Sequence, residues 1–262
     1  MPDRYAVIGN PIAHSKSPPI HAAFAASTGQ DMSYERLLAP LDGFRAALER
    51  FAAEGGKGLN VTAPFKLEAF AVASATTERA KLAGAVNTLR RVGDGWQADN
   101  TDGVGLVRDL TVNLGVDLRG QPVAILGAGG AVRGIVKPLL DAGAASVAIS
   151  NRTMAKAAEI ASQFSRYGRV EAIDPQAPGD RRFGVVINAT SLGVGGVTVG
   201  EFPFAGSIVA PGAFAYDLIY SDVPTPFMRW ALAQGAARAV DGMGMLIEQA
   251  AESFALWRGV RP

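Results

Sequence analysis

The sequence predicts an α/β protein with two α/β domains, and three observations support this. Short apolar runs alternate with segments of helical periodicity along nearly the whole chain, which is typical of sheets with mostly parallel strands. The chain has 262 residues, 48% of them hydrophobic, which is enough for two domains that each bury a core. A segment of helical pattern, residues 103–114, separates two such α/β halves and is expected to join them.

The apolar runs and the helical patterns give the expected elements in order. Strands are expected over residues 5–8, 33–39, 58–61, 122–126, 146–150, 185–188 and 214–217, and near Val170 and Ile208. Residues 86–91 and 96–98 are expected to pair as a hairpin around Gly93-Asp94-Gly95. Helices are expected over residues 18–27, 44–53, 66–73, 78–82, 103–114, 132–141, 226–233 and 243–257.

Composition excludes several classes of function. The formal net charge of +1 argues against a nucleic-acid binder that relies on electrostatic attraction. With no cysteine and only two histidines, neither thiolate catalysis nor a metal site is expected. The first residues lack the basic and apolar regions of a signal peptide, and no apolar run is long enough to cross a membrane. The expected location is the cytoplasm.

The second half contains a turn that suits a dinucleotide. Gly127, Gly129 and Gly130 follow the apolar run 122–126 and precede the helical segment 132–141, and a second apolar run follows. This strand, turn, helix and strand form the βαβ unit that binds the pyrophosphate at a helix N-terminus. Val132 stands where the motif often has a third glycine, and such turns also occur in folds that bind nothing there.

The residues after the second strand of this unit indicate which dinucleotide binds. An acidic side chain at this position would accept the ribose hydroxyl of NAD and would repel the phosphate of NADP. The chain instead has Asn151 and Arg152, followed by Lys156. The sequence therefore predicts NADP as the cofactor.

The first half contains polar side chains at spacings that suit a small polar ligand. Ser15 and Ser17 share one face of an extended segment, where their hydroxyls could hold a carboxylate, although Ser17 before Pro18 also suits a helix cap. Asn60 and Thr62 repeat this spacing.

Two charged groups of the first half have both a structural and a functional interpretation. Lys66 follows a turn at Pro64, where it is either a solvated cation at a helix start or a proton donor held in a cleft. The run Asp99-Asn100-Thr101-Asp102-Gly103 either caps the joining helix through Thr101 or Asp102, or brings a carboxylate to a cleft where the two halves meet.

Taken together, the motifs of the chain resemble those of the shikimate dehydrogenase family over essentially its full length. The matching segments occur in the family's order, and the combination is far more specific than any one of them. They are residues 9–18, 60–66, 84–88, 99–103, 127–131, 151–153, 188–191, 216–217 with 225–227, and 242–246 with Gln249.

The resemblance implies a reaction, a fold and a role for individual residues. The reaction is the reversible NADPH-dependent reduction of 3-dehydroshikimate to shikimate, with Lys66 and Asp102 as the catalytic pair. The fold implied is a substrate domain of residues 1–102 and 238–262, closed by the C-terminal helix, and an NADP-binding Rossmann-like domain of residues 103–237. The substrate would contact Ser15, Ser17, Asn60, Thr62, Lys66, Asn87, Asp102, Tyr216 and Gln249. The cofactor would contact Gly127, Ala128, Gly129, Gly130, Ala131, Asn151, Arg152, Thr153, Lys156, Thr190, Leu218, Gly242 and Met245.

Three alternatives stay open at this point, and the expected assembly is a monomer or a homodimer. A quinate/shikimate dehydrogenase with relaxed cofactor use is the nearest, although Arg152 argues against a preference for NAD. A ligand-sensing homologue without activity is a second, although both Lys66 and Asp102 are present. A folate-linked NADP dehydrogenase explains the glycine turn but not the segment with Ser15 and Ser17. Family members often have an arginine where this chain has Lys156, which would soften the selectivity for NADP.

Overall fold

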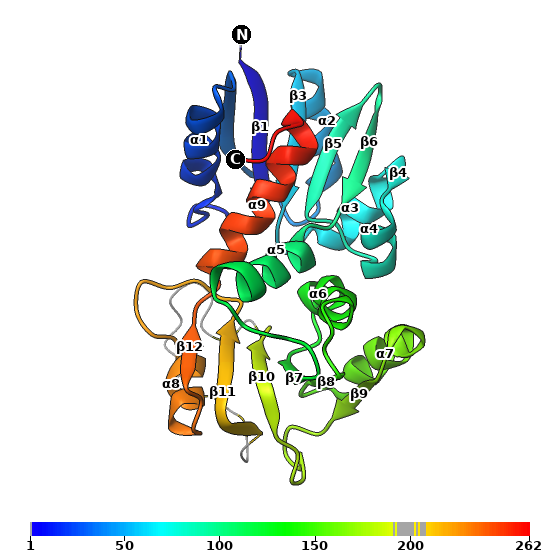
Figure 1. Ribbon diagram of the computed structural model, residues 1–262. Helices are drawn as coiled ribbons and strands as arrows, with labels where there is room; N and C mark the ends of the chain where they lie inside the picture. The colour runs from blue at the N-terminus through cyan, green and yellow to red at the C-terminus, as the bar shows by residue number, and fades with distance from the viewer. Residues whose placement is uncertain (1, 191, 193–201, 203, 205–207) are drawn as a thin grey trace. The chain divides into compact units, whose positions relative to one another are not determined.

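The computed structural model describes residues 2–190, 192, 202, 204 and 208–262 (Figure 1). Contacts within the chain divide it into two units: unit 1 comprises Met1–Gly105 and Leu246–Pro262, and unit 2 comprises Leu106–Met245. The family resemblance instead implies domain boundaries after residues 102 and 237. Ser191 of the matching segment 188–191 and all of the glycine-rich residues 193–200 lie outside the described residues.

Unit 1 is built on a mixed six-stranded sheet in the order β2-β1-β3-β5-β6-β4. β1 pairs in parallel with β2 and β3, whereas β5 is antiparallel to both β3 and β6. Its strands are β1 (Asp3–Gly9), β2 (Met32–Leu38), β3 (Gly56–Val61), β4 (Ala75–Thr76), β5 (Thr88–Val92) and β6 (Gly95–Asp99). Its helices are α1 (Ser17–Thr28), α2 (Phe44–Ala53), α3 (Lys66–Val72), α4 (Glu78–Ala83), the start of α5 (Asp102–Arg108) and most of α9 (Met243–Arg258).

The C-terminal helix α9 is part of the packing of unit 1, as the resemblance implies. The Trp257 ring stacks on Tyr5 of β1 with ring centroids 4.8 Å apart, and its indole nitrogen donates to the Leu89 carbonyl at 3.0 Å. A Cβ atom on Gly58 would lie 2.6 Å from the Trp257 ring, so only glycine admits this helix against β3. This packing holds the last turn of α9 against β1, β3 and β5.

Unit 2 has a fully parallel sheet in the order β9-β8-β7-β10-β11-β12, which is the strand order of a Rossmann fold. The strand order reverses between β7 and β10, the switch point at which such sheets bind ligands. The strands are β7 (Pro122–Leu126), β8 (Ser146–Ser150), β9 (Val170–Ile173), β10 (Phe183–Asn188), β11 (Val209–Asp217) and β12 (Arg238–Val240). The helices are α6 (Gly130–Asp141), α7 (Met154–Phe164) and α8 (Pro226–Ala233), with a short 3-10 turn η2 (Ser165–Tyr167).

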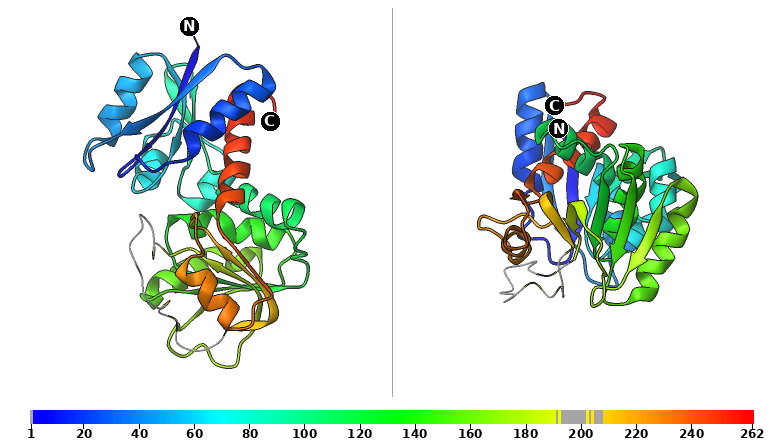
Figure 2. Two further views of the ribbon diagram at one scale, coloured as in Figure 1. Left: turned by 90° about the vertical axis from the view of Figure 1, so that its left-hand side faces the viewer. Right: turned by 60° about the horizontal axis from the view of Figure 1, so that its bottom comes forward.

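Both faces of this parallel sheet are buried. α7 packs on β8 and β9, and α8 packs on β11 and β12 (Figure 2). Ala124 and Leu126 of β7 belong to a core cluster that includes Phe227 of α8. Val123 and Ile125, which alternate with them along the strand, are equally buried. A strand buried on both faces reads as a continuous apolar run, which is why 122–126 is clear in the sequence.

Most predicted elements are confirmed, and the exceptions have physical reasons. Helix α7 is absent from the predicted elements, although its buried residues Ala157, Ile160, Ala161 and Phe164 follow helical spacing. Strands β4 and β12 are too short to leave a pattern. The predicted helix 103–114 is wrong as one α-helix, because after α5 the chain continues as a wider π-helical turn η1 (Asp109–Asn113) with Asp109 and Leu110 buried. The strand expected near Ile208 begins one residue later, as part of β11.

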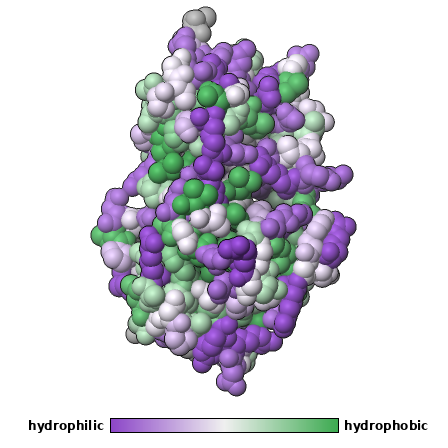
Figure 3. Space-filling model, viewed as in Figure 1, coloured by the Kyte–Doolittle hydropathy of each residue, from purple (hydrophilic) through white to green (hydrophobic). Residues whose placement is uncertain are grey.

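Hydrophilic and hydrophobic residues are interspersed over the face of the molecule shown in Figure 3. This distribution is typical of a globular protein, whose surface retains many apolar atoms. Among the described residues, none of the helices combines the length and the apolar character needed to cross a membrane.

Candidate active site

Unit 1 brings together a lysine and an aspartate at the starts of two helices. Lys66 is the first residue of α3, and Asp102 is the first residue of α5. The ammonium nitrogen Nζ of Lys66 lies 2.5 Å from Oδ2 of Asp102. The Asp102 side chain is 7% exposed and the Lys66 side chain 21%, so the pair is shielded but Lys66 still reaches solvent. A cation placed in this way can interact with a ligand while its charge is partly balanced.

Asn87 holds the other oxygen of the Asp102 carboxylate. Its amide nitrogen donates to Asp102 Oδ1 at 2.8 Å and to Gln249 Oε1 at 3.1 Å. Its amide oxygen accepts the backbone N–H of Thr101 at 2.8 Å. Thr101 in turn bonds to the Gln249 carbonyl of α9, so four segments of unit 1 meet here. At the start of α5 the backbone N–H of Asp102 donates to the Asn100 side chain at 3.1 Å.

Asn60, at the end of β3, extends the same buried network. Its amide nitrogen donates to the hydroxyls of Thr88 and Ser253, and its amide oxygen accepts from Tyr34 at 2.7 Å. His21 also bonds to this oxygen, at 3.2 Å. Because the oxygen is already an acceptor from Tyr34, His21 must donate through Nε2, and its Nδ1 has no partner among the described residues. Burial lowers the pKa of His21 to about 3, so the ring is neutral.

Ser15 and Ser17 are both buried at the start of α1. The Ser15 hydroxyl accepts the backbone N–H of Ser17 at 3.3 Å, and the Ser17 hydroxyl interacts with Tyr34. Ser17 is not the helix cap, because α1 begins at Ser17 and the cap position belongs to Lys16. Burial raises the pKa of Tyr34 well above its usual value, so its hydroxyl keeps its proton and links this segment to Asn60.

In unit 2, the glycine turn is open where a pyrophosphate would lie. Gly127 has a φ of +116°, and a Cβ atom on it would lie 2.7 Å from the Ala189 carbonyl oxygen, so glycine is required there. A Cβ atom on Gly129 or Gly130 would meet nothing within 4 Å. Helix α6 begins at Gly130 with no acidic residue in its first turn. The free N–H groups of this helix start therefore fit an anion.

The residues after β8 form a second place suited to an anion. Arg152 and Lys156 are exposed, and neither pairs with a carboxylate among the described residues. Asn151 donates to the Thr153 carbonyl at 2.9 Å, which shapes the turn before α7. Helix α7 begins at Met154 and has no acidic residue in its first turn. Its N-terminus thus adds to the positive potential of the two side chains, a contribution that the sequence interpretation lacked because it missed this helix.

A buried carboxylate holds the loops that follow β10 and β11. Asp217 accepts from the Asn188 amide at 2.8 Å, from the Thr225 hydroxyl at 2.6 Å and from the Ile219 N–H at 3.0 Å. Burial raises the pKa of Asp217, because removal from water disfavours the charged carboxylate more than the hydrogen bonds from these neutral donors favour it. Asn188 in turn accepts from the hydroxyl of Thr190 at 2.7 Å. The arrangement fixes Thr190 at the carboxyl end of β10, beside the switch point of the sheet.

Tyr216 differs from the other predicted substrate residues in its surroundings. It lies inside β11 in unit 2 and is fully buried. Its hydroxyl donates to Asp109 at 2.6 Å and accepts the Met245 N–H at 3.0 Å. Burial and the Asp109 carboxylate raise the pKa of Tyr216 far above its usual value. Both hydrogen-bonding directions of the hydroxyl are therefore used within unit 2.

The remaining predicted residues lie just after strands or, for Met245, at the start of a helix. Thr62 follows β3, and its side chain makes no hydrogen bond with the rest of the described chain. In unit 2, Gly242 lies after β12, and a Cβ atom there would be 2.5 Å from the Leu218 carbonyl oxygen. Met245 is buried at the start of α9. The residues expected at the cofactor therefore lie along the carboxyl edge of the parallel sheet and at the helix starts that follow it.

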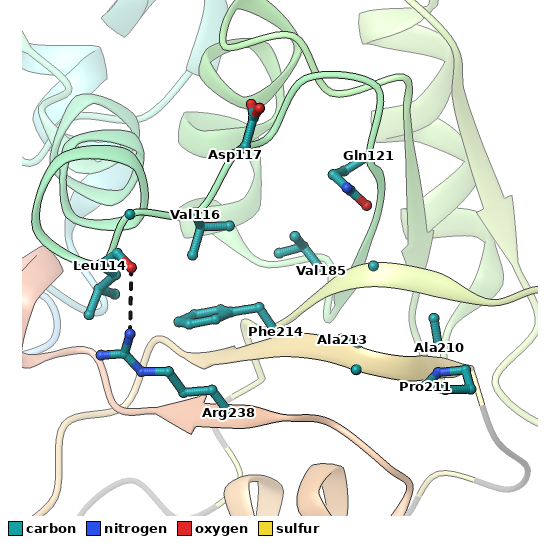
Figure 4. Close-up of a pocket in the computed structure, with 13 residues that line it drawn as sticks. Leu114, Val116, Asp117, Gln121, Val185, Ala210, Pro211, Ala213, Phe214 and Arg238 are labelled. Carbon is teal, nitrogen blue, oxygen red and sulfur yellow. Dashed lines mark hydrogen bonds between the residues drawn. The ribbon is translucent and has the colours of Figure 1, made fainter.

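A pocket of about 490 Å³ lies elsewhere in unit 2 (Figure 4). It is bordered by Leu114 and Val116, by Phe214 of β11 and by Arg238 of β12. Arg238 lies over the Phe214 ring and donates to the Leu114 carbonyl at 3.5 Å. Gln121, just before β7, and Gly184, near the amino end of β10, also line the pocket. The pocket is therefore separate from the glycine turn, which follows the carboxyl end of β7. No group of three or more histidine, aspartate and glutamate side chains in the described part of the chain is arranged to hold a metal ion.

A Rossmann-type unit with an open glycine turn, in a chain that also carries a shielded Lys–Asp pair, is the pattern expected of a dinucleotide-dependent enzyme. Comparison with known families makes this specific. Residues 7–89 match the shikimate dehydrogenase substrate binding domain, residues 110–193 match shikimate/quinate 5-dehydrogenase, and residues 242–262 match the shikimate 5'-dehydrogenase C-terminal domain. The chain belongs to the shikimate dehydrogenase family.

Individual relatives agree over the whole length. The shikimate dehydrogenase (NADP(+)) of Alkalilimnicola ehrlichii is 54% identical, over 100% of this chain and 96% of its own. The crystal structure of an Ael1 enzyme from Pseudomonas putida has a TM-score of 0.90 at 46% identity, covering 99% of this chain and 94% of its own. Shikimate 5-dehydrogenase from Thermus thermophilus, solved in complex with NADP(H) and shikimate, has a TM-score of 0.88 at 33% identity, covering 99% and 95%.

Proposed function

We propose that this protein catalyses the reversible NADPH-dependent reduction of 3-dehydroshikimate to shikimate, a step toward chorismate and the aromatic amino acids. The observation that carries the proposal is the Lys66–Asp102 pair, with Nζ and Oδ2 2.5 Å apart and the second carboxylate oxygen held by Asn87. Lys66 lies in the segment that matches the family's substrate binding domain, and Asp102 lies in the same unit of the fold. The enzyme would act in the cytoplasm on this small molecule, as a monomer or a homodimer.

The substrate would be held by polar side chains of unit 1. The buried hydroxyls of Ser15 and Ser17 suit a carboxylate, and Thr62 has a hydroxyl that no described residue engages. The amides of Asn60, Asn87 and Gln249 would border the ring hydroxyls, and each amide also has partners within unit 1. A ring rich in hydroxyls fits such a set, because an analogue that lacks one would leave a buried polar group unpaired. Tyr216 would contribute less directly, because its hydroxyl is engaged by Asp109 and by Met245.

The cofactor fits the carboxyl edge of the sheet in unit 2. The open space at Gly129 and Gly130 and the N-terminus of α6 suit the pyrophosphate. Arg152 and Lys156, with Asn151 and Thr153, would hold the adenosine phosphate, while Thr190, Leu218, Gly242 and Met245 would border the nicotinamide half. When bound, NADPH supplies the hydride for the reaction.

The protein's own residues would stabilise the charge on the carbonyl oxygen and supply its proton. As the carbonyl carbon is reduced, negative charge grows on its oxygen, which must gain a proton. The Lys66 ammonium would stabilise that charge and donate the proton. Asp102 accepts a hydrogen bond from the ammonium and directs it, and Asn87 keeps Asp102 in place. In the reverse direction the amine form of Lys66 would accept the proton from the shikimate hydroxyl and become the ammonium again.

Product analysis tests this proposal. Purified protein incubated with shikimate and NADP⁺ should form 3-dehydroshikimate and NADPH in equal amounts, and the reverse mixture should regenerate shikimate. Protein without turnover that still binds shikimate would instead support the ligand-sensing alternative. The intact Lys66–Asp102 pair favours the enzyme.

A further inference from the structure

We propose that Arg36 makes the substrate site selective for a carboxylate, by fixing Ser15 and by supplying a positive charge beside the two serines. The inference rests on the proposed function, in which Ser15 and Ser17 receive the carboxylate of shikimate. Arg36 donates to the Ser15 carbonyl twice, from Nε at 3.0 Å and from Nη2 at 2.6 Å. A guanidinium that donates two hydrogen bonds to one carbonyl oxygen restricts the orientation of that peptide group.

The segment from Asn10 to Ser15 is bonded near β2 at both ends, because Asn10 contacts the chain just after that strand. Asn10 donates from its side chain to the Ala39 carbonyl, just after β2, at 2.8 Å. Between these anchors the chain makes a tight turn, in which the Ser15 N–H donates to the Ile12 carbonyl at 3.0 Å. The two anchors together therefore set where the Ser15 hydroxyl lies.

Strand β2 presents two functional side chains on one face. Tyr34 and Arg36 are two residues apart and point to the same side, whereas Glu35 points to the other and pairs with Arg4 at 2.7 Å. Tyr34 reaches Asn60 and Ser17, and Arg36 reaches Ser15. This edge strand thus positions three of the residues proposed to bind substrate, although the sequence interpretation assigned it no role.

The positive charge of Arg36 also favours a carboxylate. Serine hydroxyls are neutral, and a carboxylate that leaves water for neutral donors alone loses much of its solvation. The guanidinium group of arginine is cationic, and that of Arg36 has donors beyond the two that Ser15 uses. Since Arg36 is exposed, solvent screens part of its effect. A change of about tenfold in apparent affinity is therefore expected, the lower end of what a charged hydrogen bond contributes.

The test compares shikimate with its methyl ester, which has the same ring hydroxyls but no negative charge. Four proteins are assayed with NADP⁺: wild type, Arg36→Met, Arg36→Lys, and Arg45→Met as a charge-matched control on the exposed face of α2. Wild type should have a KM for shikimate about tenfold below that for the ester. Arg36→Met should raise the shikimate KM about tenfold, leave the ester KM within about twofold and leave kcat nearly unchanged. Arg36→Lys, which keeps the charge, should retain part of the preference.

The pattern across the substrates decides among the explanations. If Arg36→Met raises both KM values equally, Arg36 only supports the local structure and the charge argument is wrong. If Arg36→Met leaves both KM values at the wild-type level, Arg36 is not the selecting group, whereas the carboxylate site itself stands. If wild type does not distinguish the ester, both the inference and the proposed carboxylate role of the serines are overturned. Arg36→Gln replaces Arg36→Met if thermal melting shows that the latter does not fold.

Discussion

Asn87 donates its side-chain amide to Oδ1 of Asp102 at 2.8 Å, which leaves Oδ2 of that carboxylate facing the Lys66 ammonium. The two oxygens of one aspartate therefore have separate partners, one that fixes its position and one that carries charge. Asn87 can do this because Thr101 and Gln249 hold it in turn. The orientation of the lysine consequently depends on residues from several segments of unit 1, and not on Asp102 alone.

Replacing Lys66 with alanine should mainly slow the chemical step. We expect kcat to fall by roughly 10²–10⁴, the range for a lost acid–base group, and KM for shikimate to change much less. Lys81→Ala, on the exposed side of α4, is the matched control and should behave as wild type. Steady-state kinetics with saturating NADP⁺ measure both values. Near-normal turnover of Lys66→Ala would assign the proton transfer to another group.

Arg152→Ala should weaken the use of NADP⁺ specifically. A charged contact to phosphate contributes roughly 1.5–3 kcal/mol, so KM for NADP⁺ should rise about tenfold or more. Use of NAD⁺, which lacks this phosphate, should stay weak and almost unchanged. Arg182→Ala, exposed and bonded only to a neighbouring carbonyl among the described residues, provides the control. An equal loss with both cofactors would mean that Arg152 supports the fold or the pyrophosphate and not the adenosine phosphate.

Ser15→Ala and Ser17→Ala should each weaken substrate binding more than they slow turnover. The carboxylate lies away from the carbon that is reduced, so the loss should appear mainly in KM for shikimate. A rise of about tenfold is expected for one hydrogen bond to a charged group. Kinetics at varied shikimate concentration separate the two parameters. A fall in kcat with unchanged KM would place these serines near the reacting atoms instead.

The stability of the protein should decrease with acid in a way that depends on His21. The ring is fully buried, and its pKa in the folded state is about 3, against about 6.5 when the chain is unfolded. Only the unfolded state binds the proton between these values. The free energy of unfolding should therefore fall by up to about 1.4 kcal/mol per pH unit as pH decreases from about 6.5 toward about 3.

Urea unfolding of wild type and His21→Gln across this range measures the effect. The variant should be less stable at neutral pH, because Asn60 loses a partner, but its stability should decline less with acid. His14→Gln removes the exposed histidine and should follow wild type. Parallel curves for wild type and His21→Gln would show that His21 is already protonated or accessible in the folded protein.

The sequence predicts the fold where the local pattern is strong. The apolar run 122–126 and the helical patterns 44–53 and 226–233 have the observed bounds of β7, α2 and α8. Helix α7 has a similar pattern, since its buried positions repeat at helical spacing, but it is missing from the predicted elements. By contrast, the π-helical turn contains Asp109, whose carboxylate accepts from Tyr216, far away in the chain, and the local sequence pattern does not predict this turn.

For the candidate site, the sequence predicts which residue types gather but not how they connect. Lys66 and Asp102 are named by motif, and the structure joins them. The roles of Arg36 and Ser253 follow from the pairing of β2 with β1 and from the packing of α9, neither of which a motif contains. Tyr216 matches a motif too, yet its hydroxyl bonds within unit 2.

The most direct test of the central claim is an initial-rate assay of shikimate and quinate, each with NADP⁺ and with NAD⁺. Quinate carries an additional hydroxyl on the carbon that bears the carboxylate, and we expect Ser15 and Ser17, once they hold the carboxylate, to leave little room for it. We expect kcat/KM to be highest for shikimate with NADP⁺ and roughly 10² or more lower for quinate, because a clashing group in a polar pocket is costly. Comparable values for the two acids, or equal use of NAD⁺, would contradict this account and favour a quinate/shikimate dehydrogenase of relaxed specificity.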